Sequence, residues 1–90
     1  MTAESKAAPA EAKAAPSLNH GLVRKRWGAP DAWEGNVNDP RTREEHGIRF
    51  NEKWTYFLPD GGRRLVYWYR YECRGVLRQA PDGSVQPDAH

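Results

Sequence analysis

The sequence predicts a mainly β protein, built around a small antiparallel β-meander of three to four strands. Eight of the ten aromatic residues lie between Phe50 and Tyr71, and aromatic side chains favour strands. Two turn sequences, Pro59–Gly62 and Pro81–Gly83, divide this region, because proline and glycine supply the dihedral angles that tight turns need. The predicted strands cover about residues 48–58, 63–72, 76–79 and 84–86.

The chain before the sheet divides into two parts. Residues 1–16 consist almost entirely of Ala, Pro, Glu and Lys. Ordering such a segment costs about 1–2 kcal/mol per residue in backbone entropy, with no apolar burial to offset it. We therefore predict a disordered tail over 1–16, an extended arm with a short helical turn over 17–47, and a small β-sheet domain over 48–87.

The arm carries two tryptophans, Trp27 and Trp33, on a polar segment. Glycines and a proline between residues 21 and 35 exclude a long helix there. The two indole rings have two alternative locations, and the sequence leaves both open. They either fold back over the protein's own sheet or insert into pockets on another protein, where tryptophan is a frequent anchor.

A short helix is predicted over about residues 40–46. Asp39 is a suitable N-cap, Pro40 suits the first helical position, and Gly47 suits the position just past the end. No large apolar residue lies between Pro40 and His46, so this segment would be a solvated helical turn or a loop. We interpret its Glu44-Glu45-His46 triplet as surface charge.

The segments 53–58 and 63–72 predict a β-hairpin, for which two registers are open. A four-residue loop pairs Leu58 with Arg63, whereas a three-residue loop with a glycine bulge pairs Leu58 with Gly62. We favour the first register because it gathers most aromatic residues on one face, and a one-residue slip exchanges the faces. That face would carry Phe50, Trp54, Tyr56, Leu58, Leu65, Tyr67, Tyr69 and Tyr71. The opposite face would carry Phe57, Arg64, Val66, Trp68 and Arg70.

Composition and charge limit the class of protein. The net charge is +2, and residues 49–79 hold seven basic and three acidic side chains, an excess of four. Such an excess is typical of arginines that keep a small sheet soluble, although it also suits an anionic partner. The single cysteine forms no intrachain disulfide, and no apolar run suits a signal peptide or a membrane span. We expect a cytoplasmic protein without membrane association.

Sites for chemistry are not apparent. The histidines His20, His46 and His90 are scattered and Cys73 stands alone, so we predict no metal site. Arg70 and Arg74 can lower the pKa of the Cys73 thiol, but no histidine lies near it in sequence to act as a base. We therefore predict no cofactor and no enzymatic activity in this chain alone, although it can serve as a small subunit of an enzyme complex.

Two classes of function remain. The first is a small accessory or adaptor subunit that docks on a larger protein, with a homo-oligomer as the related alternative. Its predicted partner-binding residues are Trp27, Trp33, Trp54, Tyr67, Trp68 and Tyr69. The second is a nucleic-acid-binding sheet that stacks tyrosines and tryptophan on bases. Its predicted anion contacts are Arg24, Lys25, Arg26, Arg63, Arg64, Arg70, Arg74 and Arg78.

Overall fold

The computed structural model describes residues 18–88 of the chain, so the tail predicted over 1–16 lies outside the described residues. The described part contains one helix and seven strands. In chain order these are α1 (His20–Trp27), β3 (Ala32–Gly35), β4 (Arg43–Glu45), β5 (Ile48–Phe50), β6 (Glu52–Phe57), β7 (Arg63–Tyr69), β8 (Glu72–Gln79) and β9 (Val85–Pro87). No helix in this range has the length and apolar character needed to cross a membrane.

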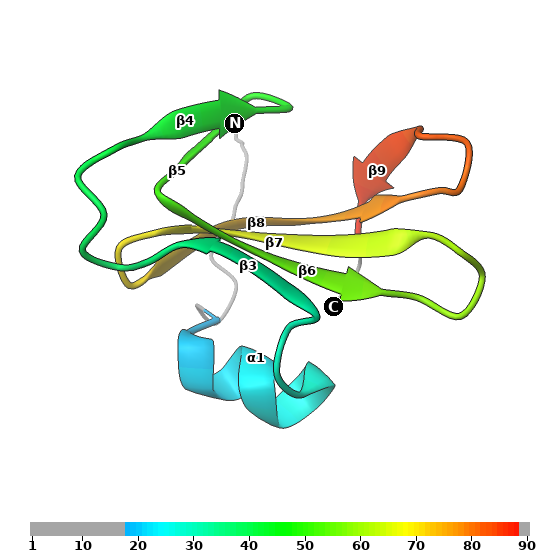
Figure 1. The fold of residues 1–90 in the computed structure, drawn as a ribbon, viewed down its shortest axis with the longest axis horizontal. Helices are drawn as coiled ribbons and strands as arrows, with labels where there is room; N and C mark the ends of the chain where they lie inside the picture. The colour runs from blue at the N-terminus through cyan, green and yellow to red at the C-terminus, as the bar shows by residue number, and fades with distance from the viewer. Residues whose placement is uncertain (1–17, 89–90) are drawn as a thin grey trace, which may run out of the picture.

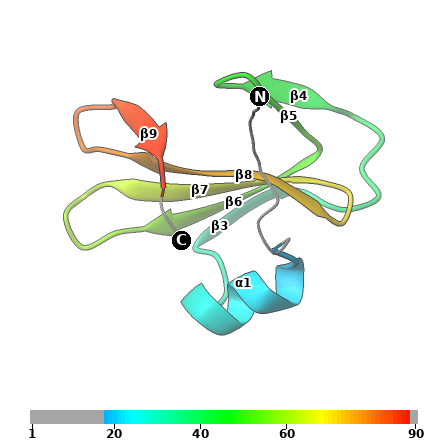
Figure 2. The same cartoon turned by 180° about the vertical axis from the view of Figure 1, so that it is seen from behind.

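Five strands form an antiparallel sheet in the order β3-β6-β7-β8-β9, and β4 and β5 form a separate two-stranded sheet. Figure 1 shows α1 on one side of the five-stranded sheet and the β4–β5 hairpin on the other, and Figure 2 shows the same arrangement from behind. The prediction of a mainly antiparallel β fold is therefore confirmed. The sheet gains a strand from residues 17–47, because β3 pairs with β6 along its outer side.

The helix predicted over 40–46 is wrong. Residues Arg43–Glu45 form β4, which pairs with β5 across a two-residue turn. Both turn residues, His46 and Gly47, have positive φ angles, of 53° and 79°, and such turns match the twist of a hairpin. Without an apolar face, this segment gained nothing from a helix, whereas pairing with β5 places it over the buried Phe50.

The helix lies instead within the predicted arm. Asn19 caps α1, because its side-chain oxygen accepts a hydrogen bond of 2.8 Å from the Leu22 amide. Gly28 ends it with a φ of 82°, and its own amide donates to the Arg24 carbonyl. A helix of eight residues fits between these two signals. Val23 is its fully buried residue, and Trp27, one turn further along, also packs against the sheet, so one face of α1 is turned toward it.

The favoured register of the β6–β7 hairpin is also wrong. Phe57 pairs with Arg63, and the Leu58 amide donates to the Gly62 carbonyl at 2.9 Å, which is the three-residue loop. Gly61 takes a φ of 88°, and the Asp60 carboxylate accepts a bond from the Gly62 amide. These local contacts in the turn decide the register, although the other register would have gathered more aromatic residues on one face. As a result Trp54 and Tyr56 share a face with Val66 and Trp68, not with Leu65 and Tyr67.

The sheet therefore has an apolar core on each side. The α1 side contains Val23, Trp54, Tyr56, Val66, Trp68 and Val76, with Leu18, Trp27 and Cys73 packed against them. The hairpin side contains Phe50, Leu65 and Tyr67, with Ile48 and Leu77 packed against them. Because both faces carry large apolar side chains, both α1 and the β4–β5 hairpin are needed to remove them from water.

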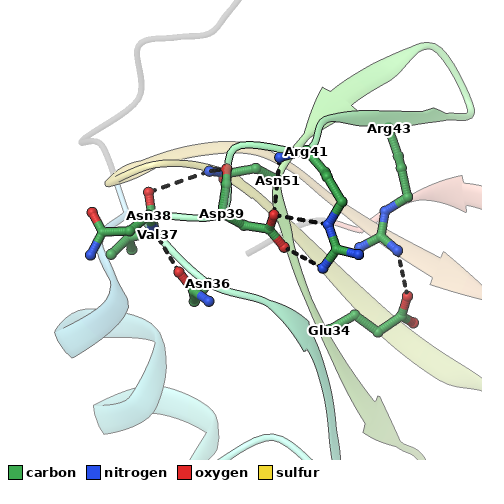
Figure 3. Close-up of polar contacts among 8 residues, drawn as sticks. All are labelled: Glu34, Asn36, Val37, Asn38, Asp39, Arg41, Arg43 and Asn51. Atoms are coloured by element: carbon green, nitrogen blue, oxygen red, sulfur yellow. Dashed lines mark hydrogen bonds and ion pairs between the residues drawn. The ribbon is translucent and has the colours of Figure 1, made fainter.

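One buried side chain, Asn51, joins the loop after β3 to the turn after β7. Its amide nitrogen donates to the Val37 and Asp39 carbonyls at 3.3 and 3.0 Å, and its oxygen accepts from the Arg70 amide at 2.9 Å. Figure 3 shows Asn51 reaching into this loop, with the Arg41 guanidinium facing the Asp39 carboxylate. The hydrogen bonds from Arg41 hold the pKa of Asp39 below its usual range. The loop is thus fixed by polar contacts.

Asn51→Ala is expected to lower the free energy of unfolding by about 3 kcal/mol, because it leaves two carbonyls and one amide without their partner and each such group costs about 1–3 kcal/mol when buried. Urea unfolding followed by circular dichroism measures this loss. Asn36→Ala is the control, since the Asn36 side chain accepts one exposed bond from the Asn38 amide. Equal losses for the two variants would contradict the role assigned to Asn51.

Candidate binding surface

Half of the predicted partner-binding residues lie in the core. Trp54, Tyr67 and Trp68 are 1%, 0% and 0% exposed, so in this fold their side chains are closed to a partner. Trp27 is half-buried against Tyr56, with ring centroids 6.1 Å apart, and Tyr69 is half-buried on β7. Trp33 differs from all of them, because 52% of it is exposed. The two alternatives left open for the arm tryptophans thus separate, with Trp27 packed inward and Trp33 facing solvent.

Trp33 occupies the middle of β3, the strand at one edge of the sheet. It pairs with Trp54 of β6, and the two ring centroids are 5.6 Å apart at an angle of 62°. Its indole therefore lies on the α1 side of the sheet. Glu34 lies on the other face of β3, where its carboxylate forms an ion pair with the Arg43 guanidinium, with nitrogen and oxygen 3.6 Å apart. Because β3 pairs only with β6 among the strands of residues 18–88, its outer edge is not covered by another strand of that range and can accept one from another chain.

Arg24 of α1 lies over both indole rings of this edge. Its guanidinium carbon is 5.7 Å from the Trp33 ring centroid and 5.3 Å from that of Trp54, which are cation–π distances. Lys25 follows it in the last turn of the helix and is exposed. We give the name basic edge to Trp33 and Arg24, which are in contact, together with the exposed Lys25 that follows Arg24 on α1. It joins an exposed aromatic ring, positive charge and an open strand.

The predicted anion contacts are not brought together elsewhere. Three of them form ion pairs within the chain: Arg64 with Asp88 at 2.7 Å, Arg74 with Glu72 at 2.8 Å and Arg78 with Asp60 at 3.0 Å. Three others lie over aromatic rings of their own chain, Arg26 over Trp27, Arg63 over Phe57 and Arg70 over Tyr69. With Tyr67 and Trp68 buried, the sheet face offers no continuous stacking platform made of these residues.

A concave region with a volume of about 520 Å³ lies on the hairpin side of the sheet. Its charges neutralise one another: Lys53 donates to the Glu45 carboxylate at 2.8 Å, and the Tyr67 hydroxyl donates to the same oxygen at 2.9 Å. The bond from Lys53, and then that from Tyr67, lowers the pKa of Glu45. Burial, and then the bond to Glu45, raises the pKa of Tyr67. These contacts fasten the β4–β5 hairpin to the sheet.

Sequence reasoning missed a buried polar cluster under the start of α1. Glu52 is 1% exposed, and its two oxygens lie 2.8 Å from His20 Nε2 and 2.8 Å from the Trp54 indole nitrogen, which donates to it. The His20 ring stacks on Trp68 with centroids 3.8 Å apart. His20 therefore ties α1 to the sheet. Only the Asn19 cap signal could have placed His20 on a helix.

The Cys73 thiol is poorly suited to nucleophilic chemistry. It packs against the α1-side core, and this burial raises its pKa to about 11. The expectation that Arg70 and Arg74 lower that pKa is wrong, because Arg74 pairs with Glu72 and burial dominates. A thiol with so high a pKa is almost entirely protonated near neutral pH, and the protonated form is a weak nucleophile.

Comparisons with protein-family models, with curated proteins and with solved structures give no match for this chain. The assignment of a function consequently depends on the surface of the protein itself.

Proposed function

We propose that this protein is a non-enzymatic accessory or adaptor subunit that docks on a larger protein through the basic edge. One observation carries the proposal: Trp33 is 52% exposed in the middle of an edge strand. Tryptophan is enriched among the residues that dominate binding at protein interfaces. An exposed tryptophan on an open strand is also a liability for aggregation unless another chain covers it.

The surroundings of Trp33 support a binding role. Three other large apolar residues in the described part of the chain are exposed, but Leu22 lies on α1, Phe57 at the end of β6 and Tyr71 in the turn before β8. Among these four residues, Trp33 alone lies on an edge strand of the five-stranded sheet. Contacts with Trp54 and Arg24 hold its ring in place, so little side-chain entropy is lost when a partner covers it.

The same features bear on catalysis and location. The protonated Cys73 thiol favours a structural role for that residue, which supports a protein without enzymatic activity of its own. A single unpaired cysteine also suits a reducing compartment. We therefore place the protein in the cytoplasm as part of this proposal.

The experiment is a pull-down of the tagged full-length chain from its native lysate, with bound proteins identified by mass spectrometry. We expect one stoichiometric partner that survives nuclease treatment. Trp33→Ala should lower its recovery at least tenfold, because an interface anchor contributes about 2 kcal/mol or more. Phe57→Ala is the matched control, since Phe57 is 57% exposed and lies on the opposite face of the sheet from Trp33.

Two results would count against this function. Equal recovery of the partner with Trp33→Ala and with the unchanged chain would remove Trp33 from the interface. Loss of all bound material after nuclease treatment would instead favour the nucleic-acid alternative. That alternative is supported by the positive charge of Arg24, Lys25 and Arg26, which no carboxylate within residues 18–88 neutralises by a direct ion pair.

A further inference from the structure

We infer that the partner supplies an extended acidic segment, which adds to the outer edge of β3 as a further strand and places its carboxylates on Arg24 and Lys25. This inference rests on the proposed docking function and specifies the chemistry of the occupant. Three features support it: the basic residues of α1 that lack an ion pair, the unused hydrogen-bond donors of Arg24, and the absence of proline from β3.

Half of the twelve basic side chains in residues 18–88 are neutralised by a local ion pair. Ion pairs of 2.7–3.6 Å join six basic side chains to carboxylates, namely Arg41, Arg43, Lys53, Arg64, Arg74 and Arg78. The other six are Arg24, Lys25, Arg26, Arg49, Arg63 and Arg70, and the first three lie in succession on α1, which has no acidic residue. Within residues 18–88 the three on α1 make no ion pair with a carboxylate, so the basic edge carries positive charge that an anionic partner can neutralise.

Arg24 is already positioned to bind a carboxylate. Its guanidinium lies within cation–π distance of the Trp33 and Trp54 rings, and these contacts favour its position beside Trp33. Its N–H groups make no hydrogen bond to another residue in the range 18–88. A guanidinium with unused donors can bind a carboxylate through two parallel hydrogen bonds. An acidic side chain reaching over Trp33 would meet these donors directly.

The two edges of the sheet differ in their capacity to accept a strand. At the far edge, β9 has three residues and ends in Pro87, which has no amide proton to donate. At the near edge, β3 has four residues and contains no proline. Addition of a peptide strand to a sheet edge is a common mode of recognition, in which backbone bonds give affinity and alternate side chains give specificity. The β3 edge is therefore the one that suits this mode.

A second copy of the chain fits this edge poorly. Antiparallel pairing of two β3 strands about a twofold axis normal to the sheet would place both α1 helices on the same face. Arg24 and Lys25 of each copy would then approach those of the other, and like charges on neighbouring strands repel. An acidic strand replaces that repulsion with attraction. Because side chains on one face of a strand recur every second residue, its carboxylates should alternate with other residues.

The test uses fluorescein-labelled ten-residue peptides in which valine alternates with Glu, Gln or Lys, together with a single-stranded ten-residue oligothymidylate. Fluorescence anisotropy with the full-length chain measures binding at low salt. We expect the Glu peptide to bind at least tenfold more tightly than the Gln peptide and the Lys peptide not to bind. Arg24→Gln should weaken binding of the Glu peptide about tenfold, and added salt should weaken it further.

Arg78→Gln is the matched control, because Arg78 is a similarly exposed arginine that pairs with Asp60, away from β3. It should leave binding of the Glu peptide unchanged. Amide exchange of residues 32–35 provides a second measurement, since an added strand should protect β3 amides. Protection elsewhere, without protection of β3, would contradict strand addition.

The inference is overturned if the Glu and Gln peptides bind equally, if no peptide binds, or if Arg24→Gln and Arg78→Gln have the same effect. Tighter binding of the oligothymidylate than of the Glu peptide would assign the basic edge to nucleic acid. Failure of the peptides while Trp33→Ala still releases a protein partner would leave the docking function in place and remove only the acidic strand.

Discussion

Trp54→Ala is expected to lower the free energy of unfolding by about 3–5 kcal/mol, the range measured for large aromatic residues truncated in a core. Trp54 is 1% exposed, and its ring contacts those of Trp68 and Trp33 with centroids 5.2 and 5.6 Å apart. The variant also removes the indole donor from the buried Glu52 carboxylate. Since small domains have total stabilities near the lower end of about 5–15 kcal/mol, much of the variant should be unfolded.

Urea unfolding followed by circular dichroism checks this loss. Trp33→Ala removes the same side chain from a residue that is 52% exposed, so its cost should be less than half as large. Trp54→Phe keeps an aromatic ring but loses the bond to Glu52, and should fall between the two. Equal destabilisation by Trp54→Ala and Trp33→Ala would show that the two rings are not divided between core and surface.

Gly35→Ala is expected to detach β3 from the sheet. Gly35 has a φ of 73°, which costs an alanine about 1–2 kcal/mol. A Cβ atom there would lie 2.1 Å from the Asn51 carbonyl oxygen and 3.1 Å from its carbon, so the backbone must also move. Amide exchange of residues 32–35 should accelerate, and binding through the basic edge should weaken with it.

Gly47→Ala isolates the dihedral contribution to this effect. Gly47 has a similar φ of 79°, but a Cβ atom would meet nothing within 4 Å. The Gly47→Ala substitution should therefore lower the free energy of unfolding by only about 1–2 kcal/mol. If Gly35→Ala proves no more destabilising than Gly47→Ala in urea, the close approach of β3 to Asn51 is not a constraint on the fold.

Local sequence signals predicted the β6–β7 hairpin at the centre of the sheet, but not α1 and the β4–β5 hairpin, which cover its two faces. The turn at Pro59–Gly62 and the strands around it depend on nearest neighbours, and both are present. The helix α1 was missed because Gly21 and Gly28 were interpreted as breakers, whereas Gly28 ends a short helix and Gly21 lies within it. The strand β4 was missed because its stability comes from pairing with β5, which composition does not reveal.

The candidate site could be predicted only in part. The sequence identified Trp33 and Arg24 as candidates, but equally Trp54 and Trp68, which are buried. Exposure of a tryptophan depends on whether its strand ends the sheet or lies inside it, and this is decided by pairing between distant segments. The hairpin register was decided by a glycine bulge, and a slip of one residue moved Trp54 to the α1 side.

Both covers of the sheet precede its central pair of strands in the chain: α1 and the β4–β5 hairpin are complete before β6 and β7 begin. During translation the ribosome therefore releases the covering segments first. When Trp54, Leu65 and Trp68 emerge, the elements that shield each face are already available for docking. The interval in which a bare aromatic hairpin is exposed to other nascent chains is thereby shortened, which favours correct folding of so apolar a sheet during synthesis.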